Sequence, residues 1–364
     1  MLLYLAACQP VESNISSSPQ QEDRTSTQLV LNNAILEQSN DRDRTVWKIK
    51  AENIVYTEDK KKATLKTVTG NLLQENKVIL KISAESGELL DNGNLILLKD
   101  KIVATAPHNG TVVRTDAIEW RPTENVLIAS ESLSATQEKM EVAAKKGKYY
   151  TDREVLELEK EVIATVFEPS LQLTSDRLIW SIPENLATSP SNLQIVRYQV
   201  DETISDRLVA DRGQVNLQDK IATLTNNIEL ISLAPQLQVA TNSLSWNYQQ
   251  RFGKTEQPIQ IIARDRQLDI TGNQGEVDFQ QQIARLSNGI KAINTKNAAQ
   301  LYARELVWYL NKETMEATGN IAYQQSDPQV NLTGEKAIGN LQTENIIVTG
   351  GGKEKPVTSV IGKP

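Results

Sequence analysis

Side chains suited to catalysis or metal binding are scarce in this sequence. Its 364 residues include one histidine, His108, and one cysteine, Cys8. Histidine-based triads and most zinc sites need more than this supply. His108 stands in a Pro-His-Asn-Gly segment that is typical of a solvated turn. Carboxylates are common, but they occupy alternating outward strand positions and turns, so the sequence predicts a protein that is not an enzyme and has no cofactor or metal.

Cys8 is the one residue whose setting indicates covalent chemistry. The segment Leu5-Ala6-Ala7-Cys8 resembles the lipobox of a bacterial lipoprotein, in which the cysteine is acylated. The alternative is an ordinary signal or anchor segment that ends in cysteine by chance. Residues 1–7 are too short for a whole signal peptide or membrane span, so we expect either that the true start lies upstream or that the assigned start is unusual. The polar, serine-rich residues 10–27 then form a flexible tether, and the protein is exported and held at a membrane.

Composition favours a thin all-β structure. Hydrophobic residues make up 39% of the chain, but aromatic residues make up only 5%. Runs of Val, Ile, Thr and Leu are separated by Asn, Gly, Asp and Lys, as is typical of strands joined by turns. The net charge is −7 without a basic patch, which argues against a nucleic-acid partner.

A repeat supplies the elements. A leucine precedes a tryptophan by 22 residues four times, at Leu98/Trp120, Leu158/Trp180, Leu224/Trp246 and Leu286/Trp308. A glycine stands 11 residues before each of these leucines, at Gly87, Gly147, Gly213 and Gly275. Successive copies are offset by 60, 66 and 62 residues, so the chain is an array of similar units.

Each tryptophan ends an apolar pattern that predicts a bent strand. Apolar residues lie two and seven positions before it, and the polar residues between them indicate a bend or bulge. We expect the interior-facing set to be Val113, Ile118, Trp120, Leu173, Leu178, Trp180, Val239, Leu244, Trp246, Leu301, Leu306 and Trp308. These residues form either a closed core or the wall of a lipid-binding groove, and in stacked strands the two surfaces can be continuous.

The repeat divides the chain into four predicted parts. They are the N-terminus and tether (1–27), a first β-repeat half (28–190), a second half continuous with it (191–352) and a flexible tail (353–364). Pro183 and Pro190 mark a predicted loop over 183–206, which holds the six extra residues of the longest unit. Asn-Gly pairs at Asn92-Gly93, Asn109-Gly110 and Asn288-Gly289 predict hairpin turns.

With the repeats in place, the chain resembles the LptC family, the periplasmic component of the lipopolysaccharide export machine. The segments that carry the resemblance are Trp47–Glu52, Val68–Leu72, Ile82–Leu89 and Asn109–Trp120. The resemblance implies an elongated β-jellyroll or β-solenoid-like array with an apolar groove, related to the LptA/OstA group. It also implies that the groove binds lipid A acyl chains and passes lipopolysaccharide from an inner-membrane ABC transporter to an LptA-like periplasmic bridge protein. The expected location is the periplasm, with the N-terminus anchored in a membrane, preferably the inner one. Cys8 departs from the family pattern, in which a membrane-spanning anchor stands there.

Two other functional hypotheses stay open at this point. One is a structural β-repeat envelope lipoprotein with a closed core and no lipid cargo. The other, least favoured, is a carbohydrate-active enzyme with a glycosidase-like carboxylate pair.

Open sheet edges are the predicted partner surfaces. The run Leu29-Val30-Leu31, with Trp47 and Ile49 nearby, lacks protecting charges, and so does the segment around Ile346 and Val348. We expect the N-terminal edge to add strands to the transporter and the C-terminal edge to receive the next bridge protein.

Overall fold

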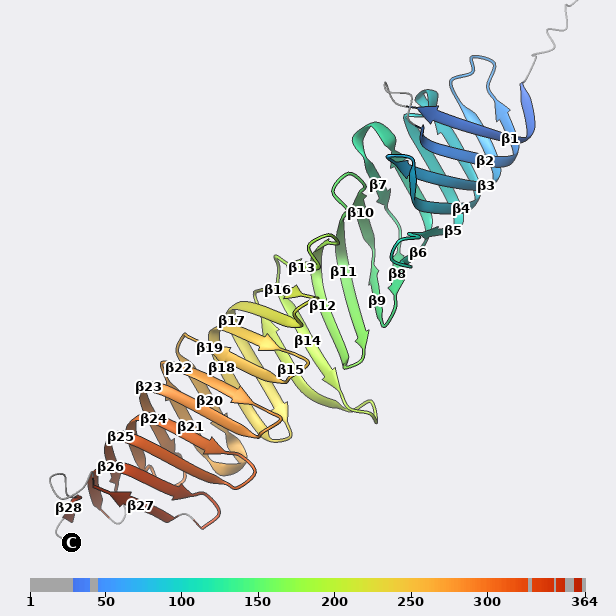
Figure 1. The fold of residues 1–364 in the computed structure, drawn as a ribbon. Helices are drawn as coiled ribbons and strands as arrows, with labels where there is room; N and C mark the ends of the chain where they lie inside the picture. Colours follow the sequence, from blue (N-terminus) through green and yellow to red (C-terminus); the bar gives the residue numbers. More distant parts are fainter. Residues whose placement is uncertain (1–28, 40–44, 327–328, 344, 351–356, 362–364) are drawn as a thin grey trace, which may run out of the picture.

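The protein is an elongated antiparallel array whose strands run across its long axis (Figure 1). The computed structural model describes residues 29–39, 45–326, 329–343, 345–350 and 357–361. These residues form 28 strands and three single-turn 3-10 helices, so the all-β prediction is confirmed. The predictions for Cys8 and for the tether over 1–27 lie outside the described residues.

Long strands that belong to two hydrogen-bonded layers are the framework of the array. In β5 (Leu95–Thr105) and β6 (Val112–Arg121), residues 102–105 pair with 112–115 in layer A, and residues 96–99 pair with 117–120 in layer B. The other long strands split in the same way. They are β1 (Val30–Ser39), β2 (Thr45–Tyr56), β3 (Ala63–Gln74), β4 (Lys77–Leu90), β11 (Val155–Phe167), β12 (Ser170–Ser181), β17 (Ile221–Leu233), β18 (Gln236–Asn247), β23 (Ile283–Asn294), β24 (Gln300–Tyr309), β25 (Thr314–Gln325) and β26 (Val330–Asn340).

Short strands fill each layer between the long ones. Layer A contains β8 (Leu133–Gln137), β9 (Met140–Ala144), β14 (Leu193–Tyr198), β15 (Ile204–Ala210), β20 (Ile259–Ala263), β21 (Leu268–Gly272) and β28 (Thr358–Ile361). Layer B contains β7 (Val126–Ala129), β10 (Lys146–Tyr150), β13 (Leu186–Ser189), β16 (Arg212–Asn216), β19 (Phe252–Thr255), β22 (Gln274–Asp278) and β27 (Asn345–Thr349). The 3-10 turns are η1 (Asp91–Gly93), η2 (Pro122–Glu124) and η3 (Arg264–Arg266). β28 lies within the predicted flexible tail over 353–364 and pairs with β26. The boundary of the tail stays a prediction.

In β5, β11, β17, β23 and β25, two consecutive residues with left-handed backbone angles produce the bend. Asn226 (φ 64°) and Asn227 (φ 49°) form an unpaired step in β17, where the register with β18 shifts between Thr225 and Ile228. At each step before a tryptophan-bearing strand, the preceding strand has one residue more than its partner. The bulge therefore lies one strand earlier than the polar step suggested, while the predicted bend is confirmed. The Asn288-Gly289 pair is the equivalent step inside β23, so the hairpin predicted there is wrong. The type I′ turn that Asn-Gly favours and this bulge both need two consecutive positive φ angles, and the sequence alone does not separate them.

The repeat spacing follows from cross-strand pairing in layer B. Each repeat glycine lies opposite the repeat leucine, which in turn lies opposite the apolar residue two before the tryptophan, as in Gly87, Leu98 and Ile118. A Cβ atom at Gly87 would lie 2.9 Å from the Leu97 carbonyl oxygen. Glycine is needed there because the neighbouring backbone approaches too closely for a side chain.

The predicted loop over 183–206 is largely ordered strand. It contains β13, β14 and the start of β15, and both layers continue through it from β12 to β17. The β14–β15 hairpin is longer than the equivalent β8–β9 hairpin, which accounts for the longer repeat unit. The division of the chain near residue 190 stays a prediction. The buried apolar residues form three clusters along the axis, within 47–127, 133–178 and 193–337.

Candidate functional site

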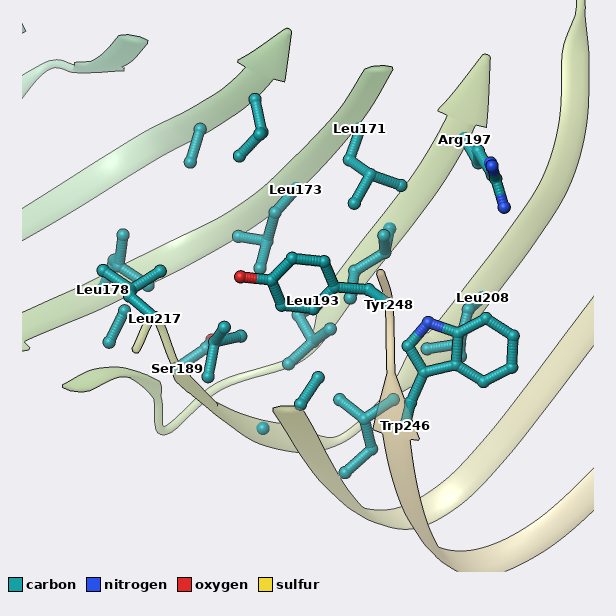
Figure 2. A pocket seen from close by; sticks show the side chains of 18 of the residues that line it. Leu171, Leu173, Leu178, Ser189, Leu193, Arg197, Leu208, Leu217, Trp246 and Tyr248 are labelled. Atoms are coloured by element: carbon teal, nitrogen blue, oxygen red, sulfur yellow. The ribbon is translucent and has the colours of Figure 1, made fainter. Parts of the chain in front are cut away.

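The candidate site is an apolar cavity between the two layers in the middle of the array. Its volume is about 140 Å³, and its lining comes from β9 and from the strands β11 through β18 (Figure 2). Leu171, Leu173, Leu178, Leu193 and Leu208 form much of its wall. Apolar cavities of this order remain free of water and accept apolar ligands.

Most of the predicted interior residues line this cavity or its neighbours. Val113 and Ile118 line an N-terminal cavity of about 90 Å³, and Leu173, Leu178 and Trp180 line the central cavity. Val239, Leu244 and Trp246 line a small cavity of about 20 Å³, and Leu301 lines a C-terminal cavity of about 500 Å³. Trp120, Leu306 and Trp308 are buried in the core clusters instead.

Two of the repeat tryptophans separate successive cavities. Trp180 lines both the N-terminal and the central cavity, and Trp246 lines both the central and the small one. Trp180 is 6% exposed, and its indole N–H has no acceptor among the described residues. A buried donor without an acceptor typically costs about 1–3 kcal/mol. From the N-terminal cavity to the small one, the interior is therefore a row of cavities divided by Trp180 and Trp246.

Sequence reasoning missed the polar residues of the central cavity. Arg197 and Asp206 are cross-strand partners in β14 and β15, and Tyr248 follows β18. Figure 2 shows the Tyr248 hydroxyl among Leu173, Leu178 and Leu193. Burial raises the pKa of the Tyr248 phenol above its ordinary value. The sequence signal that could have located Arg197 is side-chain alternation along its strand, because Arg197 shares a strand face with residues 193 and 195.

Charged side chains join the two layers along the side of the array opposite the bends. Arg251, in the layer B turn after β18, lies 3.9 Å from the Asp206 carboxylate of layer A. Arg266 of η3 lies 3.2 Å from Glu313, in the layer B turn between β24 and β25. The Arg266 guanidinium also lies 5.6 Å from the ring centre of Trp308. These contacts hold the layer edges together over the C-terminal half of the array.

A family comparison decides the class of protein. The family model described as "Lipopolysaccharide-assembly, LptC-related" matches residues 1–168 and 180–296. The chain belongs to the LptC family. This confirms the resemblance carried by the repeat segments, and it assigns the protein to lipopolysaccharide transport.

Other comparisons add less. The structure is similar to the crystal structure of LptH, the LptA homologous periplasmic component of the lipopolysaccharide transport device of Pseudomonas aeruginosa, at 10% sequence identity and a TM-score of 0.27. The similarity covers 43% of this chain and 95% of that chain. No curated protein matches the sequence.

The edges of this LptC-family array differ from the predicted partner surfaces in detail. β1 is the N-terminal edge strand, while Trp47 and Ile49 lie in β2, at 3% and 2% exposure, with their side chains in the core. At the other end, β27 pairs with β26, and Ile346 and Val348 pack against the core. Ile347 between them is 61% exposed. The predicted edge residues therefore lie at or next to the two ends of the array with their side chains facing inward, and their role in partner binding stays a prediction.

Metal-binding clusters and membrane-spanning helices are both absent from the described part of the chain. No group of three or more histidine, cysteine, aspartate or glutamate side chains is arranged to hold a metal ion in the described residues. Across the same residues, no helix has the length and hydropathy needed to cross a membrane.

Proposed function

We propose that the protein binds lipopolysaccharide through its acyl chains in the interior between layers A and B. In this proposal it receives the lipid from an inner-membrane ABC transporter and passes it to an LptA-like bridge partner in the periplasm. The supporting observation is the central cavity, whose lining is almost wholly aliphatic and aromatic. Family membership supports the lipid class.

The energetics favour reversible carriage. Each methylene moved from water into an apolar site contributes about 0.8 kcal/mol before ordering costs. A few methylenes in the central cavity thus give weak binding, and a whole chain needs more space than one cavity offers. Trp180 and Trp246 stand between cavities, so passage along the interior requires these side chains to move aside. The transporter supplies the energy for directional movement.

A closed-core envelope lipoprotein is the alternative function. The burial of Trp120, Leu306 and Trp308 in the core clusters favours it, because these repeat residues pack against other side chains of the core. In that case the cavities are packing defects, and lipid contacts occur only on the outer faces.

Site-specific photo-crosslinking distinguishes the two functions. Leu208 lines the central cavity, whereas its neighbour Arg207 in β15 is exposed on the opposite strand face and serves as the matched control. A photoreactive amino acid at Leu208 is expected to capture lipopolysaccharide in cells with an active exporter, and one at Arg207 is not. Lipid capture at Arg207 together with only intramolecular links at Leu208 would sink the interior pathway.

The membrane attachment is a separate proposal. Acylation of Cys8, followed by the polar residues 10–27, would tether the array to the inner membrane. Mass spectrometry of the mature N-terminus from native membranes is expected to show a lipid-modified Cys8. An unmodified Cys8 inside a longer uncleaved segment would indicate an ordinary membrane anchor.

A further inference from the structure

An unpaired guanidinium lines the apolar central cavity. Arg197 is partly buried, and no hydrogen bond or ion pair to its guanidinium is found within the described part of the chain. Figure 2 places it at the border of the cavity, on the same side as Trp246. A partly desolvated cation that makes no hydrogen bond or ion pair is costly, and proteins normally pair such groups. The N–H donors of this guanidinium are therefore open to an anionic ligand.

A second arginine from layer B joins Arg197. Arg251 lies close enough to repel it, and burial together with this repulsion lowers the pKa of Arg197, while Asp206 acts in the opposite direction. The Nε atom of Arg251 is buried and has no hydrogen-bond partner among the described residues. The 3.9 Å separation from Asp206 is at the limit of an ion pair, so Asp206 satisfies the pair of arginines only in part.

The charge balance of the cluster favours an anion. Arg197, Arg251 and Asp206 together carry one net positive charge. The ring centre of Phe279 lies 5.6 Å from the Arg251 guanidinium, within the range of a cation–π contact. Guanidinium groups bind phosphate through paired N–H donors, which a lysine does not reproduce.

We propose that Arg197 and Arg251 bind the phosphorylated headgroup of a lipid whose acyl chain enters the central cavity. This inference rests on the proposed function for the use of the cavity by an acyl chain. It adds that the middle of the array selects lipids by headgroup charge. The two arginines come from different layers, so a bound phosphate also bridges the layers at this point.

Calorimetric titration of the full chain tests the inference. The probes are dihexanoyl phosphatidic acid, dihexanoyl phosphatidylcholine and inorganic phosphate, which separate headgroup, chain and free anion. The wild type is expected to bind phosphatidic acid about tenfold more tightly than phosphatidylcholine, the range of a charge-assisted contact. Arg197→Gln and Arg251→Gln should each lose this preference and leave phosphatidylcholine binding unchanged. Arg207→Gln, an exposed neighbour in β15, is the matched control and should behave as wild type.

The outcomes separate the two proposals. Equal binding of both lipids by the wild type, or an unchanged preference in both arginine variants, would overturn the headgroup site and leave acyl-chain binding standing. Inorganic phosphate binding as tightly as phosphatidic acid would also overturn it, because a free anion site needs no chain. Absence of binding by either lipid would refute the acyl-chain function itself.

Discussion

Single residues set how closely the strands approach. Gly87→Ala would place a methyl group 2.9 Å from the backbone carbonyl of Leu97 and 3.0 Å from the Leu98 side chain. We expect a loss of about 1–3 kcal/mol in the free energy of unfolding, because the backbone must shift to relieve the overlap. Gly339→Ala is the control, since its nearest atom would lie 4.0 Å away. Urea unfolding measures both, and equal midpoints would contradict the close-approach explanation.

The buried phenol of Tyr149 makes the stability of the fold depend on pH in the alkaline range. It lines the N-terminal cavity, and burial, with a smaller contribution from Glu154, raises its pKa from 10.0 to about 12. Between these values the unfolded chain loses the phenol proton while the folded protein keeps it, so stability falls as pH rises. Tyr149→Phe should therefore lose less stability than the wild type between pH 10 and pH 12. Parallel unfolding curves against pH for the two proteins would refute the assignment.

The residues that sequence reasoning located and those it missed differ in how often their pattern recurs. The Leu, Trp and Gly landmarks recur in four units, and strand alternation then places Leu178 and Trp180 in the interior. Arg197 and Tyr248 occur in one unit only, so no repeat marks them. Their role depends on which strands of layers A and B lie opposite each other. That information comes from three-dimensional pairing and not from local periodicity.

Among the elements, the bulged long strands determine the two-layer architecture. Asn226 has a φ of 64° at the bend of β17, a region in which a β-branched side chain is strained. Asn226→Val should destabilise the protein by about 1–2 kcal/mol, whereas Asn226→Gly should be neutral or slightly stabilising. Chemical denaturation checks the pair, and a neutral valine variant would show that the bend tolerates another backbone geometry.

The element boundaries were predictable where side-chain alternation is strong. The tryptophan strands were located and their bends recognised from the polar step. Asn288-Gly289 and the segment 183–206 were misassigned because glycine and proline signal a change of direction without saying whether pairing continues. In β23 the chain bends and stays in the sheet. Around Pro183 and Pro190, turns alternate with short strands that pair in separate layers.

The contact between Arg266 and Glu313 offers a measurable link between the layers. The Arg266 side chain is only 18% exposed, but Glu313 is partly solvated, so the coupling should be modest. A double-mutant cycle with Arg266→Ala and Glu313→Ala is expected to give about 0.5–1 kcal/mol of coupling that weakens in high salt. Zero coupling at low salt would mean that packing of the layers, including Arg266 against Trp308, suffices to hold this edge.

At the scale of the whole molecule, an elongated array leaves strand edges at both ends. The C-terminal cavity reaches β27, where Ile346 is part of its lining, so a partner strand added to β27 would extend the interior. We propose that the LptA-like bridge protein docks at this edge and that the transporter docks at β1. Substitution of Ile346 or Val348 is a poor test, because both side chains pack against the core.

Ile347 gives the sharper test of C-terminal docking. It is 61% exposed between the two inward-facing residues, and lysine on an edge strand discourages strand addition. Ile347→Lys should abolish pull-down of the bridge protein while changing the free energy of unfolding by less than about 0.5 kcal/mol. Ile163→Lys is the matched control, since Ile163 is also exposed but lies in β11, which has paired neighbours on both sides. If both variants retain the partner, docking occurs at another surface. If both lose it, a general effect of the added charge is responsible, and the specific claim for β27 fails.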